Sequence, residues 1–351
     1  MRAPVHHILP LATIERERLL PVPGKVTVKL DQKVTSTDVI AEAVWSREHV
    51  LVDVARKLGV SSDEADRLLR VKTGDKVVEG GEIAISPGFI PKLVRAPRAG
   101  RVVAAGGGQV LLETGDAMIT MKAGLSGTVI QVIPNRGAVI RAVGAVIQGY
   151  WGNGKIETGL MLNMTEKPDD MLTASRLDVS LRGSVILGGL LDNAETLHVA
   201  DSLPVRGLVL SSISPTLLPV ARQVQFPIMV TDGFGRLPMN SVAYKLLTSN
   251  AKREVTLNAE PYDRYSGVRP EVIIPLPVSQ EPPTPRDVDT LAPGQIVRLR
   301  RAPHAGEIAT LVELRSGLAK LPSGMRAQSA EVKLGSGEQI LVPLVNLEIV
   351  G

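Results

Sequence analysis

The 351-residue sequence contains no cysteine, and this absence removes several functions at once. Disulfides, thiolate zinc sites and cysteine nucleophiles all require that residue. Aromatic residues make up only 3% of the chain, so few rings are available to stack on bases or sugars. The cores must therefore be built from Val, Ile, Leu, Ala and Met.

Long apolar runs are also absent, since no stretch reaches the roughly 18 residues that a membrane helix needs. The first twenty residues contain two histidines and four consecutive charged residues, so we expect no secretory leader and a cytoplasmic protein. The net charge of +4 permits contact with nucleic acid without requiring it. The length predicts two or three domains.

Sequence signatures of catalysis are scarce. The five histidines are not spaced as a metal-binding pair, and no G-x-S-x-G nucleophile elbow occurs. We therefore predict no catalytic residue, no metal and no cofactor, and we favour a non-enzymatic protein. The histidines are His6, His7, His49, His198 and His304.

The centre of the chain, residues 183–259, alternates short apolar runs with helical segments. Runs of this kind, bounded by turn residues, are typical of strands buried on both faces, and intervening helices imply parallel pairing. Ser214 with Pro215, and Asn240 with Ser241, predict the starts of the second and third helices. We predict a small parallel α/β sheet whose strands are residues 184–187, 207–210, 227–230 and 254–257.

One strand-to-helix loop of this unit is a candidate anion-binding site. Its residues are Asp232, Gly233, Gly235, Arg236 and Asn240. Backbone amides and Arg236 could cradle an anion there, although the loop lacks the G-K-[ST] of a Walker A motif. The alternative is a structural turn in which Asp232 caps backbone amides, with Asp232 and Arg236 forming an ordinary surface ion pair.

Residues 47–70 predict two short helices separated by Gly59. Ser61 and Glu64 form a capping box for the second helix. The pair is superficially similar to a helix-turn-helix, but the first positions of the second helix are acidic, so phosphate would be repelled. We interpret it as a structural helical hairpin.

Residues 71–84 read V-K-T-G-D-K-V-V-E-G-G-E-I-A, and residues 94–103 read V-R-A-P-R-A-G-R-V-V. This resembles the barrel-sandwich hybrid of biotinyl and lipoyl domains, over about residues 21–150. In that family the modified lysine lies about seven residues before the "A-P" alanine, a position held here by Phe89. Lys92 and Lys122 are displaced from it, so we expect neither biotin nor lipoate.

Residues 293–312 and 330–349 resemble the KOW motif of transcription-elongation factors and ribosomal proteins. The resemblance implies a five-stranded barrel that binds RNA, ribosomal protein or another protein. Strand alternation predicts Arg298 and Arg300 on one exposed face, with Arg301 and His304 extending the positive edge. We expect these residues to contact nucleic acid; pairing with nearby glutamates or an acidic protein partner is the alternative.

The sequence thus predicts a mixed α/β and all-β multidomain protein that binds nucleic acid or a nucleoprotein assembly through its last domain. An α/β domain that binds a small anion or nucleotide or acts as an enzyme, and a purely structural assembly protein, remain alternatives. No membrane contact is expected, and the oligomeric state stays open. The predicted parts are an arm (1–20), a barrel-sandwich-like domain (21–154), the α/β domain (155–274), a proline-rich linker (275–292) and the KOW-like barrel (293–351).

Overall fold

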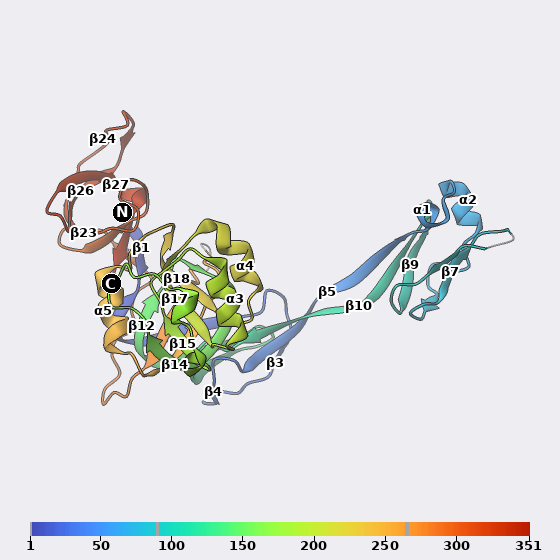
Figure 1. Ribbon diagram of the computed structural model, residues 1–351, viewed down its shortest axis with the longest axis horizontal. Coiled ribbons are helices and arrows are strands. Elements are labelled where there is room, and N and C mark those ends of the chain that lie inside the picture. The colour runs from blue at the N-terminus through green and yellow to red at the C-terminus, as the bar shows by residue number, and fades with distance from the viewer. Residues whose placement is uncertain (1, 89–90, 264–266) are drawn as a thin grey trace.

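A computed structural model describes residues 2–88, 91–263 and 267–351. The protein is mostly β, with several sheets and one α/β part, as the sequence predicts. Figure 1 shows a central body, a C-terminal β domain at one end, and a long two-stranded ribbon that leads to a small module at the other. We call these the body, the C-terminal domain, the ribbon and the distal module.

The body is built on four parallel strands with helices on both faces. One face packs on α3 (Ala194–Ser202) and α4 (Leu218–Gln223), and the other packs on α5 (Ser241–Ser249). The fully apolar runs form strands because both of their faces are covered. The parallel strands are, in sheet order, β18 (Ile228–Phe234), β17 (Gly207–Ile213), β15 (Ser184–Leu187) and β14 (Ile156–Asn163).

Two predictions for this unit are wrong. Strand β14 was not among the predicted strands, because Glu157, Thr158 and Gly159 interrupt its apolar residues and it does not form a continuous apolar run. Strand β19 (Glu254–Asn258) was expected to be parallel, but it pairs antiparallel with β14 and with β20 (Glu271–Pro275). The sheet then continues through β12 (Gly137–Gln148), so it crosses the domain boundary expected near residue 154.

An arm was expected over residues 1–20, but residues 2–19 contain two strands. Strand β2 (Ile8–Leu19) pairs with β12 along most of its length, and its residues Ala12 and Ile14 are buried. Strand β1 (Arg2–His6) instead joins the C-terminal domain, parallel to β28 (Leu347–Val350). The N-terminal residues therefore connect the body to the C-terminal domain.

The ribbon consists of β5 (Val39–Asp53) and β10 (Gln109–Lys122) in antiparallel pairing. At about 3.4 Å per residue, its longer strand spans about 50 Å. The helix predicted over residues 47–58 is wrong for its first half, because those residues continue β5 and the helix α1 (Val54–Leu58) begins only at Val54. The long-range ladder to β10 overrides the local helical pattern.

The distal module has a core of its own, formed by two short helices, the far end of the five-stranded sheet that contains the ribbon, and a separate two-stranded sheet. As predicted, Gly59 ends α1 with a φ of 76°, and the hydroxyl of Ser61 caps α2 (Ser62–Arg67). The sheets place β9 (Gly100–Gly106) beside β6 (Lys76–Val77) and pair β7 (Glu82–Ile85) with β8 (Leu93–Arg95). The ribbon is thus the connection between this core and the body.

The C-terminal domain is a seven-stranded sheet that runs in the order β21-β1-β28-β22-β23-β26-β27. Its consecutive antiparallel strands are β22 (Ile296–Leu299), β23 (Ile308–Leu314), β26 (Ser329–Leu334) and β27 (Gln339–Pro343). A small hairpin of β24 (Ala319–Lys320) and β25 (Arg326–Ala327) projects from it. The segment expected as a linker contributes β21 (Val288–Thr290), which pairs with β1.

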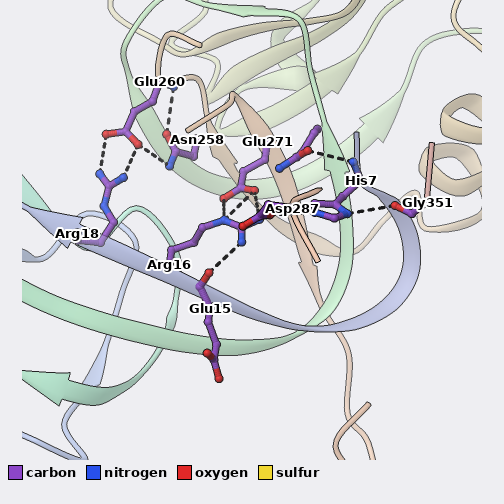
Figure 2. Close-up of polar contacts among 10 residues, drawn as sticks. His7, Glu15, Arg16, Arg18, Asn258, Glu260, Glu271, Asp287 and Gly351 are labelled. Carbon is purple, nitrogen blue, oxygen red and sulfur yellow. Dashed lines mark hydrogen bonds and ion pairs between the residues drawn. The ribbon is translucent and has the colours of Figure 1, made fainter. Parts of the chain in front are cut away.

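Figure 2 shows how charged side chains fix β2 to the later part of the chain. Arg16 donates to the buried carboxylate of Glu271 at 2.7 Å, and Arg18 donates to both oxygens of Glu260. His7 is buried, with Nε2 3.0 Å from Asp287 Oδ1. These contacts join segments about 240 or more positions apart. The two arginines fix β2 within the body, and His7 contacts the segment just before β21 of the C-terminal domain.

Candidate functional site

Three separate parts of the chain meet at a cavity of about 170 Å³ between the body and the C-terminal domain. The body contributes Tyr150, after β12, and the carboxyl end of β18. The C-terminal domain contributes the end of β22 and the loop that follows it. Ligands of open α/β sheets bind in crevices at the carboxyl ends of parallel strands, and this cavity has that position. Its polar and aromatic lining includes Tyr150, Asp232, Phe234, Arg298, Arg300 and Glu348.

Asp232 is buried at the end of β18, and donors satisfy both of its carboxylate oxygens. Oδ2 accepts from Thr231 Oγ1 at 2.7 Å and from the backbone amide of Asn240 at 3.1 Å, while Oδ1 accepts from Asn240 Nδ2 at 3.1 Å. Burial raises the pKa of Asp232 above its ordinary value, although Arg298 and these donors act in the opposite direction. Asp232 is therefore tied into the protein rather than presented to solvent.

Arg298 is the principal cation of the cavity. Its side chain is only 4% exposed, Nη2 donates to the backbone oxygen of Asp232 at 2.6 Å, and it lies 3.7 Å from the carboxylate. The guanidinium carbon lies 5.6 Å from the ring centre of Tyr150. Among the described residues, Nη1 of Arg298 has no hydrogen-bond partner.

The prediction that Arg298 lies on an exposed face of its strand is wrong. Val297 and Leu299 do face the core of the C-terminal domain, as strand alternation required. The opposite face of β22, however, is covered by the end of β18, so Arg298 is enclosed as well. Arg300 and Arg301 are exposed. Nδ1 of His304 lies 3.0 Å from Oε1 of Glu307, so Glu307 contacts the histidine of this loop.

The predicted anion-binding loop is only partly at the cavity. Gly233 lines it with a φ of 133°, and Gly235 has a φ of 96°, so both need conformations that favour glycine. Arg236 points elsewhere and donates to Asp192 at 3.0 Å, so the predicted pair with Asp232 is wrong. The predicted cap is confirmed, because Asn240 Oδ1 accepts from Ala243 at the start of α5.

A second buried ion pair involves Glu348 of the cavity lining. Arg269 donates to Glu348 at 2.5 Å, and both side chains are less than 10% exposed. His6 lies in the same region, where burial first, and then the charges of Arg298 and Arg269, hold its pKa well below its ordinary value. His6 is therefore neutral at pH 7, surrounded by fixed charges.

Three of the nine aromatic residues gather at one edge of the cavity. The ring centre of Phe234 lies 6.0 Å from that of Tyr150 and 6.5 Å from that of Trp151, and both pairs have edge-to-face geometry. The sequence analysis did not identify Tyr150 as a site residue, and these two aromatics lie just before the domain boundary expected at residue 154. Their rarity in the chain was the signal that could have identified them.

The lysines considered for a prosthetic group have other positions. Lys92 Nζ donates to the backbone oxygen of Leu58 at 3.3 Å, and Lys122 ends β10 near the body. Phe89, at the carrier position, lies outside the described residues. The expectation that no biotin or lipoate is attached stays a prediction.

No protein-family profile matches the chain, and no curated protein matches it at a significant level. Within residues 2–88, 91–263 and 267–351, His, Asp and Glu side chains form no group of three suited to a metal ion. None of the helices in that part of the chain is long and apolar enough to cross a membrane.

Proposed function

We propose that the protein is a non-catalytic binding or adaptor protein that brings two partners together. One observation carries the proposal: the C-terminal domain and the distal module lie at opposite ends of the molecule, held apart by the body and the ribbon (Figure 1). A two-stranded ribbon adds little stability of its own, because an isolated hairpin is only marginally stable in water. Its use here favours a module that must reach a partner away from the body.

In this proposal the C-terminal domain is a KOW-like barrel that contacts nucleic acid or a nucleoprotein. The antiparallel order β28-β22-β23-β26-β27 supports that assignment. With Arg298 buried, we propose that phosphate is contacted by exposed cations of the loop after β22 and of the projecting hairpin. They are Arg300, Arg301, Lys320 and Arg326.

The distal module is proposed to be barrel-sandwich-like and to contact a protein partner without a prosthetic group. Its short antiparallel strands support this, as does the motif turn at Gly80, which has a φ of 74°. The alternative of a purely structural assembly protein differs from this proposal in requiring no nucleic acid.

Fluorescence anisotropy of the full-length chain with single-stranded RNA and with duplex DNA tests the nucleic-acid contact. We expect micromolar affinity. The logarithm of the binding constant should fall linearly with the logarithm of the salt concentration, by about 0.7 to 0.9 per phosphate contact. The double variant Arg300→Ala/Arg301→Ala should weaken binding. It should also reduce the salt slope by the contribution of about two phosphate contacts.

The matched control is Lys72→Ala/Lys76→Ala, which removes the same charge from exposed positions on the distal module. It should leave both affinity and slope unchanged. Absence of binding at low salt, or equal losses in the two double variants, would show that the C-terminal domain is not a specific nucleic-acid contact.

A further inference from the structure

The cavity at the junction is lined by Arg298, whose guanidinium has one buried N–H group without a hydrogen-bond partner among the described residues. Nη1 of Arg298 is shielded from solvent and has no partner among the described residues, although a buried donor left unsatisfied costs about 1–3 kcal/mol, or more if charged. We propose that this cavity is a ligand site for the carboxylate or phosphate group of a small molecule, with Arg298 as its principal contact.

The charges around the cavity favour an anion. The two acids in its lining are already engaged, since Asp232 accepts from Thr231 and Asn240, and Glu348 pairs with Arg269. Arg298 uses Nη2 on the backbone of Asp232 and leaves Nη1 free. Arg300 adds a second positive charge in the same lining. Guanidinium N–H groups bind carboxylate and phosphate oxygens with short, strong hydrogen bonds.

The size and lining of the cavity restrict the rest of the ligand. A volume of about 170 Å³ holds a small molecule but not a polymer segment. The rings of Tyr150 and Phe234, together with Leu237, offer an apolar surface beside the guanidinium. The favoured ligand is therefore a compact anion with a flat or apolar portion that packs on these rings.

Such a ligand would touch two domains at once. Asp232–Phe234 belong to the body, whereas Arg298 and Arg300 belong to the C-terminal domain. Binding should therefore stabilise the attachment of the C-terminal domain as well as the cavity. The site differs from the one that the sequence predicted, because Arg236 on the same loop points away and pairs with Asp192.

Thermal unfolding of the full-length chain with benzoate or with inorganic phosphate, at ionic strength held constant with chloride, tests the proposal. We expect a saturating rise in Tm with at least one probe, by an amount set by mass action. A response to benzoate alone identifies a carboxylate with a ring, and a response to phosphate alone identifies a phosphate. A flat response to both probes overturns the proposal.

Variants then locate the site. Arg298→Gln should weaken probe binding by about ten-fold or more, as expected for the loss of a charge-assisted hydrogen bond. Arg236→Ala is the matched control and should keep the full Tm rise. An unchanged response in Arg298→Gln, or a lost response in Arg236→Ala, contradicts the assignment.

A direct measurement remains if Arg298→Gln does not fold. In Trp45→Phe the remaining tryptophan is Trp151, which contacts Phe234 at the edge of the cavity. The probe that raises Tm should change its fluorescence with the same saturation, and adding Arg300→Gln should raise the half-saturating concentration. A Tm rise without any fluorescence change places the probe elsewhere and overturns the proposal.

Discussion

The body and the distal module differ in how far their ion pairs are buried. The body buries arginines and carboxylates together, including at its junction with the C-terminal domain, where Arg269 of the body pairs with Glu348 of β28 and both side chains are less than 10% exposed. The distal module and the ribbon keep their ion pairs in solvent, as in Arg98 with Glu48, whose side chains are 62% and 49% exposed. Buried pairs fix one geometry when both partners are present, whereas exposed pairs add little.

This difference matches the two roles that the geometry favours. The body must hold segments from both ends of the sequence in one arrangement around a cavity. The distal module has its own apolar core and depends on the ribbon only for its position. We therefore expect charge substitutions to be severe in the body and mild on the module, and the following predictions test that contrast.

The largest effect should come from breaking the buried pair. Arg269→Met leaves Glu348 buried without its partner, so it should lower the free energy of unfolding by about 3–5 kcal/mol. The matched change Arg98→Met, on the exposed pair, should cost less than about 1 kcal/mol. Chemical denaturation of both variants measures the difference. Equal losses would mean that the two regions do not differ in the proposed way.

A smaller effect, confined to one region, is expected from a cavity in the distal core. Ile83 is fully buried there, and Ile83→Ala should destabilise the module by about 2–5 kcal/mol. Hydrogen exchange should then speed up in residues 54–108 while the parallel strands of the body keep their protection. The same change in the body, Ile186→Ala, should do the reverse. Global acceleration in both variants would contradict separate cores.

The smallest predicted effect is a dependence of stability on pH. The folded pKa of His6 lies below its unfolded value near 6.5, so the unfolded chain binds more protons in the window below about pH 6.5. Stability contributed by neutral His6 is therefore present above that pH and is lost as pH falls through the window toward the folded pKa.

Replacing His6 by Asn should flatten the loss of stability between about pH 7 and pH 5, measured by denaturation at several pH values. The control His198→Asn, at an exposed position on α3, should keep the wild-type dependence. The same slope in both variants would place the titrating group outside this junction.

Local patterns in the sequence identified the elements whose surroundings are uniform. The apolar runs that became β15, β17 and β18 are covered on both faces, so composition alone indicated strands. The caps at Ser61 and Asn240 were identified because a cap depends on residues only a few positions away. Residues 47–53 were predicted as helix but form a strand, because their conformation is set by pairing with β10, about 60 positions later.

The candidate site could be predicted only in part, for a physical reason. Asp232 was recognised because the carboxyl end of a buried strand is a general ligand position. Its true partner, Arg298, comes from another domain, and no local pattern shows that the exposed-looking face of β22 is covered by β18. Tyr150 joins them from a third segment.

The ribbon also has a mechanical consequence. Both of its strands run continuously between the body and the distal module, and the ladder hydrogen bonds between them lie across the long axis. A pull on the distal module along that axis is therefore carried by two covalent backbones in parallel, and the hydrogen bonds are not unzipped. A sideways load meets only the bending stiffness of a two-stranded strip. The ribbon should therefore resist extension but bend easily. The distal module could then change its direction toward a partner while it stays firmly attached to the body.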